Sequence, residues 1–402
     1  MTTERPPDWD PREPETFDSP HAVYADLRRR CPVPWSDAFG GFWAATRYED
    51  VVRIARDNET FSTAVQNVVP HVPRSSRRPP LHFDPPEHGI YRAPLDRVMS
   101  RATVRRLEPA FLAAAGDLLR PMLARGGGDY SKEFALPFAA QCFAEFLGLP
   151  LDQVLEIRRI GVDYSFAIQD MDKPRIMRAS DELYGIARAL VDERRRDPRD
   201  PATDMVTGLL TADPPIPGDL VVGTVRQTIV AGIGAPHAVL GSAAVHLARE
   251  PDFQQRLRDR PDLLPNAIEE LLRLYAPYRV FARTATRDVE VGGRTVRAGE
   301  PITMLFPSAN RDETVFPDPD RLDLDRSPNR HLAFGRGAHR CPGTALARMQ
   351  MAAALRSLLE STSEITLDGP VEMFNWLEFG PKSVPLRLIG SLPTGEEAPV
   401  AG

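Results

Sequence analysis

Near the carboxyl end of the chain, a single cysteine lies in a glycine-rich turn directly before a helical pattern. The segment reads Phe334-Gly335-Arg336-Gly337-Ala338-His339-Arg340-Cys341-Pro342-Gly343, and the helical pattern covers Thr344–Leu359. Gly335 and Gly337 permit a positive φ, so we expect a tight turn here. Such a turn can present the Cys341 thiolate to a metal while backbone N–H groups point at the sulfur. This geometry suits a haem iron, on which a thiolate ligand favours O–O cleavage.

Cys341 taken alone leaves other interpretations open. A lone cysteine is usually a small buried hydrophobic residue. Cys341 with His339 or His331 would also suit the nucleophile and base of a thiol hydrolase, which predicts a colourless protein that is alkylated at one cysteine. A zinc site is the weakest interpretation because the scattered cysteines and histidines lack the spacing of zinc ligands.

The segment that ends at Gly343 resembles the haem-binding signature of the cytochrome P450 superfamily, Phe-Gly-x-Gly-x-His/Arg-x-Cys-x-Gly, at every fixed position. Three further segments resemble motifs of the same family and follow in its order along the chain. They are Asp84-Pro85-Pro86-Glu87-His88 with Arg92 beyond it, Glu270-Leu271-Leu272-Arg273, and Phe316-Pro317-Asp318-Pro319-Asp320-Arg321. The resemblance therefore covers nearly the whole chain.

The resemblance implies a fold that is mainly α with small β-sheets (α+β). In the cytochrome P450 fold, a triangular helical prism encloses a long central helix that crosses the haem. We expect one haem domain over residues 21–392, a loose N-terminal segment over residues 1–20, and a C-terminal tail over residues 393–402. Length alone would favour two or three domains.

The cofactor implied by the resemblance is heme b (iron-protoporphyrin IX), with Cys341 as its metal ligand. Asp84 is predicted to cap a helix with Pro85 in its first turn. His88 and Arg92 are four residues apart on that helix and share a face, which suits one anionic group; a solvated basic face is the alternative. The predicted cofactor-binding residues are His88, Arg92, Arg283, Phe334, His339, Cys341 and Gly343.

The longest helical pattern, Leu220–Glu250, departs from the family at the point where its helix passes the haem. The family motif there is Ala-Gly-x-Asp/Glu-Thr, whose acid and hydroxyl organise water and deliver protons. This chain has Gly234 in place of the acid and Ala235 in place of the threonine. Pro236 cannot donate to the carbonyl of Gly232, so we expect the helix to kink or open there.

Four hypotheses remain for how the protein could work without the acid and the hydroxyl of the family motif. The freed carbonyl of Gly232 could bind a water, His237 could relay protons, or a polar group of the substrate could organise the water. The iron could also perform chemistry that needs no such delivery, such as peroxide-driven oxidation or nitric-oxide-dependent nitration. The candidate catalytic positions are Gly232, Gly234, Ala235, Pro236 and His237.

Glu270 and Arg273 are three apart on a helical pattern and can form a charge-assisted pair. The resemblance implies that Arg321 completes this ion-pair network, which holds the segment that leads into the cysteine turn. Its predicted role is structural. Without the resemblance, an exposed pair of little energetic value would be the simpler interpretation.

Composition and charge narrow the class of protein. The formal net charge of −6 and the absence of a basic block argue against a nucleic-acid partner. Three cysteines without a Cys-x-x-Cys pair, a polar N-terminus and no stretch of about 18 apolar residues favour a cytoplasmic protein with no membrane segment.

The predicted activity is that of a haem-thiolate monooxygenase, an oxidoreductase that inserts one oxygen atom of O2 into a small or medium organic substrate. Electrons would come from a separate ferredoxin or flavodoxin-type donor with its NAD(P)H reductase, docked near Arg336, Arg340 and Arg348, and we expect a monomer. A haem-binding sensor without turnover is the alternative from another class. Substrate would contact the loop around Val68, Val69 and Val72, the helical residues Phe166, Ile168 and Met171, and the segment Phe374–Phe379.

Overall fold

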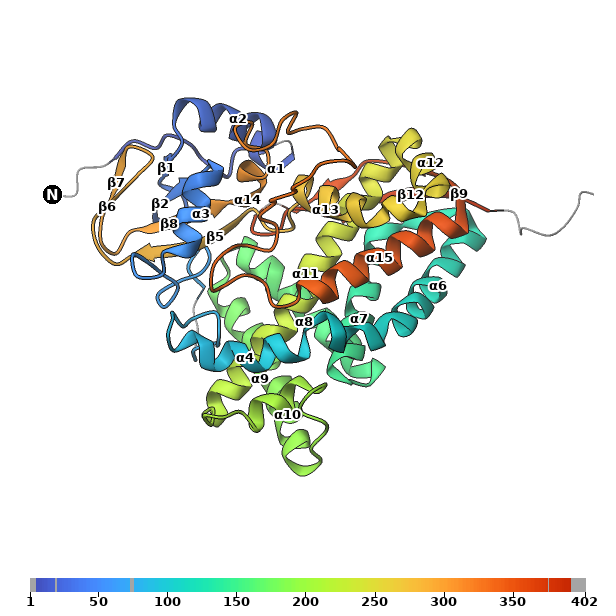
Figure 1. Cartoon of the computed structure of the whole chain (residues 1–402), viewed down its shortest axis with the longest axis horizontal. Coiled ribbons are helices and arrows are strands. Elements are labelled where there is room, and N and C mark those ends of the chain that lie inside the picture. Colours follow the sequence, from blue (N-terminus) through green and yellow to red (C-terminus); the bar gives the residue numbers. More distant parts are fainter. Residues whose placement is uncertain (1–4, 19, 73–75, 375, 392–402) are drawn as a thin grey trace, which may run out of the picture.

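The computed structural model describes residues 5–18, 20–72, 76–374 and 376–391. In Figure 1 the molecule has a triangular outline, with its larger β-sheet at the left and most helices at the right and bottom. The fold is mainly helical with small sheets, as the sequence predicts. The predicted C-terminal tail, residues 393–402, lies outside the described residues.

Helices make up most of the described chain. They are α1 (Pro14–Asp18), α2 (Pro20–Arg30), α3 (Tyr48–Arg56), α4 (His88–Val98), α5 (Arg101–Val104), α6 (Glu108–Arg125), α7 (Leu136–Leu147), α8 (Leu151–Gln169), α9 (Lys173–Arg196), α10 (Met205–Leu210), α11 (Gly218–Arg249), α12 (Pro251–Asp259), α13 (Leu264–Leu274), α14 (Phe306–Ala309) and α15 (Thr344–Ser361), with shorter turns η1 (Ala38–Gly40), η2 (Arg105–Leu107), η3 (Tyr130–Ala135) and η4 (Pro261–Leu263). The polar residues and Pro174 in the segment 170–174 predict a break between two helices. The break is confirmed, because α8 ends at Gln169 and α9 begins at Lys173.

The strands form four small sheets. They are β1 (Trp35–Ser36), β2 (Phe42–Ala45), β3 (Phe61–Ser62), β4 (Gly127–Asp129), β5 (Val280–Ala285), β6 (Val289–Val291), β7 (Arg294–Val296), β8 (Pro301–Leu305), β9 (Thr362–Leu367), β10 (Glu372–Met373), β11 (Pro381–Ser383) and β12 (Pro385–Gly390). The largest sheet has the order β1-β2-β8-β5-β3, in which β2 and β8 are parallel. The alternating pattern of residues 289–296 around Gly292-Gly293 predicts a hairpin. The hairpin is confirmed as β6–β7, with positive φ at both glycines.

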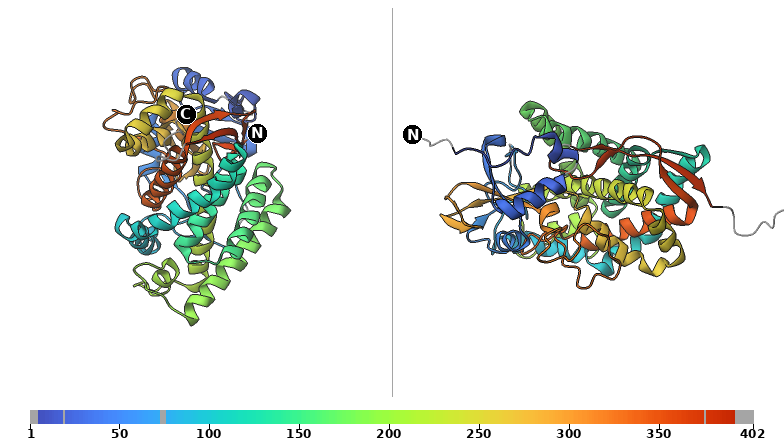
Figure 2. Two further views of the ribbon diagram at one scale, coloured as in Figure 1. Left: turned by 90° about the vertical axis from the view of Figure 1, so that its right-hand side faces the viewer. Right: turned by 90° about the horizontal axis from the view of Figure 1, so that it is seen from above.

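Helix α11 is the central element of the core. Its 32 residues correspond to about 48 Å, and Figure 2 shows it running through the middle of the molecule when seen from above. It is long and apolar enough to cross a membrane, but 61% of its most apolar window is buried inside the protein. Its apolar character is therefore that of a core helix.

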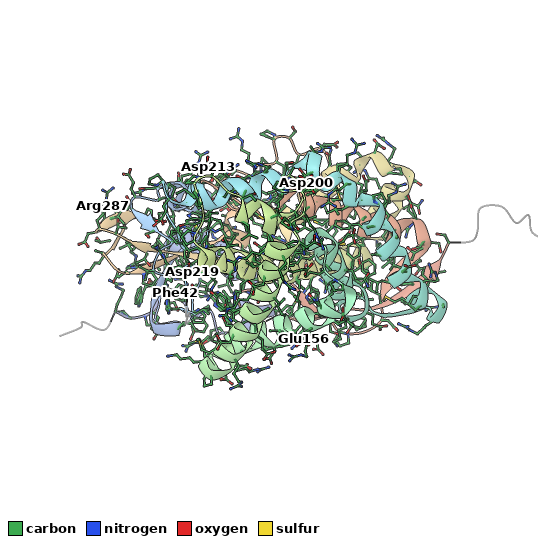
Figure 3. The ribbon with its side chains drawn as sticks, turned by 90° about the horizontal axis from the view of Figure 1, so that it is seen from below. Phe42, Glu156, Asp200, Asp213, Asp219 and Arg287 are labelled. Carbon is green, nitrogen blue, oxygen red and sulfur yellow. The ribbon has the colours of Figure 1, made fainter. Side chains whose placement is uncertain are left out.

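Seen from below, α8 with Glu156 and the start of α11 with Asp219 lie on the same face as α9 (Figure 3).

The sequence predicts that α11 kinks or opens at Pro236, and the opening is wrong. The helix is continuous from Gly218 to Arg249, although Pro236 has no N–H to donate to the carbonyl of Gly232. Most residues between Val221 and Ala248 are buried on this helix, which packs against several neighbouring elements. This packing outweighs the local cost of one lost backbone hydrogen bond, since tertiary context commonly overrides propensity.

Two predictions about the N-terminal half are also wrong. The segment before residue 21 is not loose in its described part, because Trp9 is 7% exposed and packs edge-on against Tyr24 and Phe42. Asp84 does not cap α4, which begins at His88 after a cis Pro85–Pro86 bond. Its carboxylate instead accepts hydrogen bonds from Thr63 and Ser62 at the end of β3.

Candidate functional site

The Cys341 turn has the geometry that its sequence predicts. Gly335 and Gly337 have φ values of +66° and +72°. The Cys341 N–H donates to the Phe334 carbonyl over 2.8 Å, which closes the turn directly before α15. Burial raises the pKa of the Cys341 thiol, and a backbone hydrogen bond from Gly343 opposes this rise. A buried sulfur that already accepts an N–H suits a thiolate ligand better than a water-exposed nucleophile.

A cavity of about 370 Å³ lies above this turn and is walled by residues of α4, α11, β5 and the loop that follows β3. All of the residues predicted to bind the cofactor line it, namely His88, Arg92, Arg283, Phe334, His339, Cys341 and Gly343. Another hollow, of about 610 Å³, is lined by residues between Thr314 and Arg330 and contains none of them. Of these two hollows, the first combines the cysteine with the predicted anion-binding side chains.

The basic side chains in this cavity are arranged for an anion. Arg283 is 4% exposed, and its Nε atom and Nε2 of His88 lie buried without a hydrogen-bond partner among the described residues. The rings of His88 and His339 are 4.5 Å apart. Burial and the neighbouring charges of Arg283 and His88 lower the pKa of His339 to about 2, and burial lowers that of His88 to about 4.

Buried donors that lack acceptors carry a desolvation cost that an anionic ligand would remove. The propionates of a haem have the required charge, and Arg283 offers a guanidinium that matches a carboxylate. Arg92 is held in place by Asp96, with 2.7 Å between Nε and Oδ1, and by the Ala338 carbonyl at 3.1 Å. The side chains present in the cavity thus fit a haem with Cys341 on one face.

The α11 positions predicted to be catalytic divide into two groups. Gly232, Ala235 and Pro236 line the cavity, whereas Gly234 and His237 do not. His237 is 6% exposed and lies 2.7 Å from the Ser131 hydroxyl, which itself donates to the Pro381 carbonyl at 3.0 Å. Burial lowers the pKa of His237 to about 4. The side chain lies outside the cavity lining and joins α11 to η3 and β11, which favours a structural role. The relay role stays a prediction.

An acid that sequence reasoning missed lies beside the gap in the α11 motif. A β-carbon built on Gly234 would be 3.8 Å from Oε1 of Glu378 and 4.0 Å from the hydroxyl of Tyr278. Glu378 is 8% exposed, and both residues line the cavity, where an isolated antiparallel bridge joins their backbones. Burial and the charge of Glu378 raise the pKa of Tyr278 above its usual value. The available signal was the presence of Glu378 in the C-terminal segment that was predicted to contact substrate.

The ion-pair network is present, with one different member. Arg273 donates to both carboxylate oxygens of Glu270, over 2.6 and 2.9 Å, and both side chains are fully buried. The second guanidinium on Glu270 belongs to Arg326, whose Nε lies 3.1 Å from Oε1. The prediction of Arg321 is wrong, since the residue is exposed and joins the network through its backbone carbonyl, which accepts from Arg273 at 2.9 Å.

The predicted docking arginines differ in how far they are free to meet a partner. Arg348 forms a two-point ion pair with Glu269, with distances of 2.6 and 2.7 Å, and its guanidinium lies over the Phe334 ring. Arg340 is exposed on the turn itself. Arg348 is therefore a positioning residue beside the cysteine turn, and Arg340 is the better candidate for a surface contact.

Some of the residues predicted to contact substrate line the cavity, and others do not. Val68, Val72, Ile168, Leu377 and Glu378 line the cavity. Met171 does not, because it is 41% exposed at the turn between α8 and α9. Phe166 and Phe374 pack against each other, with ring centroids 6.1 Å apart. Residues 73–75 and 375 lie outside the described residues.

Comparisons with known proteins agree with this geometry. The model of the family described as Cytochrome P450 matches residues 166–376. The chain is 33% identical to mycinamicin IV hydroxylase/epoxidase of Micromonospora griseorubida, a match that covers 84% of this chain and 86% of that protein. It is 34% identical to nocardicin C N-oxygenase of Nocardia uniformis subsp. tsuyamanensis, with 89% and 91% covered.

Solved structures extend the likeness to the whole fold. The structure of cytochrome P450 CYP109Q5 from Chondromyces apiculatus superimposes with a TM-score of 0.85 at 28% identity and covers 95% of this chain and 98% of that one. The turn that presents Cys341, the cavity above it and the relatives found over nearly the full length lead to one conclusion. The chain belongs to the cytochrome P450 family and is a haem-binding oxidoreductase of the monooxygenase type.

Proposed function

We propose that this protein inserts one oxygen atom of O2 into a small or medium organic substrate, using electrons from a separate ferredoxin or flavodoxin-type donor and its NAD(P)H reductase. The observation that carries the proposal is the position of Cys341 on the wall of a cavity that also holds Arg283, His88 and His339. A haem, proposed to be heme b, would supply the oxygen-activating iron when bound. Cys341 would hold the iron, and the three basic residues with Arg92 would hold the propionates.

In this proposal, Glu378 takes the role of the acid that α11 lacks at Gly234. Its Oε1 lies beside the helix position that Gly234 leaves without a side chain, and the Tyr278 hydroxyl lies on the same side. A carboxyl group at the wall of a cavity that admits water can hold a proton and pass it to an ordered water. Glu378 would hold that proton and Tyr278 would orient the carboxylate. The backbone carbonyl of Gly232 and a polar group of the substrate remain alternatives as water-binding groups.

Peroxide-driven oxidation and nitric-oxide-dependent nitration are less favoured when an acid is available at this place. A sensor that binds haem without turnover is the remaining alternative. Turnover assays with NAD(P)H, reductase and ferredoxin, and separately with hydrogen peroxide, discriminate between them. We expect product only with the electron donor; product with peroxide alone would favour the peroxygenase, and no product from a broad substrate panel would favour the sensor.

Arg340 is proposed to contact the acidic electron donor. Arg340→Glu should raise the apparent KM for ferredoxin severalfold at unchanged kcat, whereas Arg188→Glu, at an exposed position on α9, should not. Arg348 is unsuitable for this test because its reversal would also break the pair with Glu269. The cytoplasmic location, the monomeric state and the single domain over residues 21–392 stay part of the proposal.

A further inference from the structure

We propose that Arg78 and Arg226 form an anion-binding site in the same cavity and that they recognise the carboxylate of an organic acid substrate. This inference rests on the proposed monooxygenase function and names its substrate class. Arg78 lies in the loop that follows β3 and Arg226 lies on α11, and both line the cavity. Neither was expected from the sequence, in which each is one of many arginines.

Both guanidinium groups are buried without a counter-charge. Arg226 is fully buried and Arg78 is 6% exposed. Over the described residues, neither forms an ion pair, and Nε of Arg78 and both Nε and Nη1 of Arg226 have no hydrogen-bond partner. Their recorded contacts are neutral: Arg226 donates to the Ser180 hydroxyl at 3.2 Å, and Arg78 donates to the Tyr164 hydroxyl at 3.4 Å.

An unpaired buried charge is strongly destabilising because no partner compensates for its lost hydration. Arginine cannot avoid this cost by losing its proton. Two such charges that share one tyrosine also repel each other. Burial lowers the pKa of Arg226, and the charge of Arg78 acts in the same direction. A bound anion would remove both penalties, which is the physical reason to expect one here.

Tyr164 is the group that links the two arginines. The Arg226 guanidinium lies 4.8 Å from the centroid of its ring. Burial disfavours the phenolate, but the charges of Arg226 and Arg78 outweigh burial and lower the pKa of Tyr164. A phenolate could neutralise one of the two arginines. The second would still lack a partner, so Tyr164 alone does not complete the site.

The pair is separate from the proposed propionate site. His88 packs against His339, and Arg92 binds Asp96 and the Ala338 carbonyl. Arg78 donates to the Tyr164 hydroxyl, and Arg226 donates to Ser180 and lies over the Tyr164 ring. These two sets of side-chain contacts share no residue. The haem propionates therefore leave Arg78 and Arg226 available for a different anion.

The shape of the cavity points to an organic acid. The wall of the same cavity carries apolar residues from four segments of the chain, among them Val72, Phe143, Ile168 and Val230. Ala235 is nine residues beyond Arg226, which corresponds to about 13.5 Å along the helix. A guanidinium offers a planar fork for a carboxylate. A monocarboxylate with an apolar body would thus place its carboxylate at the arginines and its body towards the haem side.

The test measures binding rather than turnover. Purified holoenzyme is titrated by calorimetry with phenylalkanoic acids and straight-chain fatty acids of increasing length, and with the primary amide of each. The variants are Arg78→Gln, Arg226→Gln and Arg226→Lys, and the control is Arg188→Gln, which removes one exposed positive charge on α9. Tyr164→Phe examines the contribution of the phenol. Thermal unfolding of each variant shows whether it is folded.

We expect at least one acid to bind tenfold or more tightly than its amide. Arg78→Gln and Arg226→Gln should each weaken acid binding at least tenfold and change amide binding less than twofold, with Arg226→Lys between them and Arg188→Gln unchanged. Equal binding of acids and amides, no acid binding at all, or equal loss of both ligands in the variants would overturn the site. Chloride or phosphate binding as tightly as the organic acids would also overturn it, because the pair would then hold a structural ion.

Failure here is distinguishable from failure of the proposed function. The carbon monoxide spectrum of the reduced protein reports the thiolate-bound haem and does not depend on Arg78 or Arg226. A normal spectrum with no preference for acids would overturn the carboxylate site alone. An abnormal spectrum with a clear preference for acids would overturn the monooxygenase proposal alone.

Discussion

Glu378 lies beside Gly234, with 3.8 Å between its Oε1 atom and the place where a β-carbon of Gly234 would be. The central helix lacks an acid at this position, and the C-terminal segment brings one to the same place from another part of the chain. Glu378 can lie here because Gly234 has no side chain to fill the space. The proposed proton delivery can therefore be tested by mutation of Glu378.

Glu378→Gln removes this acid and keeps the volume of the side chain. We expect kcat to fall at least tenfold and more of the consumed NAD(P)H to yield peroxide instead of product, because protons then arrive slowly. Substrate affinity should change less than threefold. In the Glu378→Gln background, Gly234→Asp should restore part of kcat, since nothing lies within 3.8 Å of the new β-carbon. Unchanged kcat and coupling in the single variant would remove Glu378 from the mechanism.

His237 should affect stability at acid pH and not turnover. Its pKa is about 4 in the folded protein, against the ordinary value of 6.5 that the unfolded chain keeps, so the unfolded chain binds the proton first as the pH falls. Stability from the neutral imidazole is full above pH 6.5 and is lost between pH 6.5 and 4, by roughly 3 kcal/mol in total. His237→Gln should lack this loss. Urea unfolding of both proteins at pH 7 and pH 5 measures the difference in stability. A large loss of kcat in the variant at pH 7.5 would contradict this prediction and support a proton relay through His237.

Variants of Arg326 and Arg321 test the ion-pair network, with the Arg321 variant as the control. Arg326→Ala leaves the buried Glu270 carboxylate with one guanidinium fewer, and we expect a loss of about 2–3 kcal/mol of stability together with lower haem retention. Arg321→Ala keeps the backbone carbonyl that Arg273 uses, so its effect should stay within about 0.5 kcal/mol. Chemical denaturation and the ratio of haem to protein after purification are the measurements. Equal effects of the two variants would contradict the assignment.

The two glycines of the cysteine turn should differ in their tolerance of a side chain. At Gly337 a β-carbon would lie 2.2 Å from the backbone oxygen of Ala55, whereas at Gly335 the nearest atom is 4.0 Å away. Both have positive φ, so Gly335→Ala should cost about 1–2 kcal/mol. Gly337→Ala should cost more than about 3 kcal/mol, because backbone must move as well. Thermal unfolding of the two variants decides this, and equal melting temperatures would show that the Ala55 contact can relax.

The sequence predicts correctly the elements whose cause is local. The cysteine turn follows from two glycines that need positive φ, and the break between α8 and α9 follows from polar residues and Pro174. The predictions that fail concern contacts between distant segments. The sequence pattern makes Asp84 a helix cap, but its carboxylate binds the end of β3, and Pro236 predicts an opening in a helix that tertiary packing keeps intact.

The sequence also fails to predict contacts between distant segments at the site. The spacing of a known motif identifies Cys341 and the basic residues around it, because each of them has a fixed position in a motif. Glu378, Arg326, Arg78 and Arg226 belong to no short pattern in this chain. Their importance comes from burial and from the neighbours that the fold supplies, such as the missing side chain at Gly234 beside Glu378. A single sequence does not show which distant residues the fold brings together.

The central claim is that Cys341 binds a haem iron as a thiolate, and the carbon monoxide difference spectrum of the reduced protein tests it most directly. Wild-type protein reconstituted with haem should show the strongly red-shifted Soret band of thiolate ligation. Cys341→Ser should lose that band, while Cys142→Ser, a change at a buried cysteine that does not line the cavity, should keep it. A wild-type protein without haem, or a red-shifted band that survives in Cys341→Ser, would contradict the account.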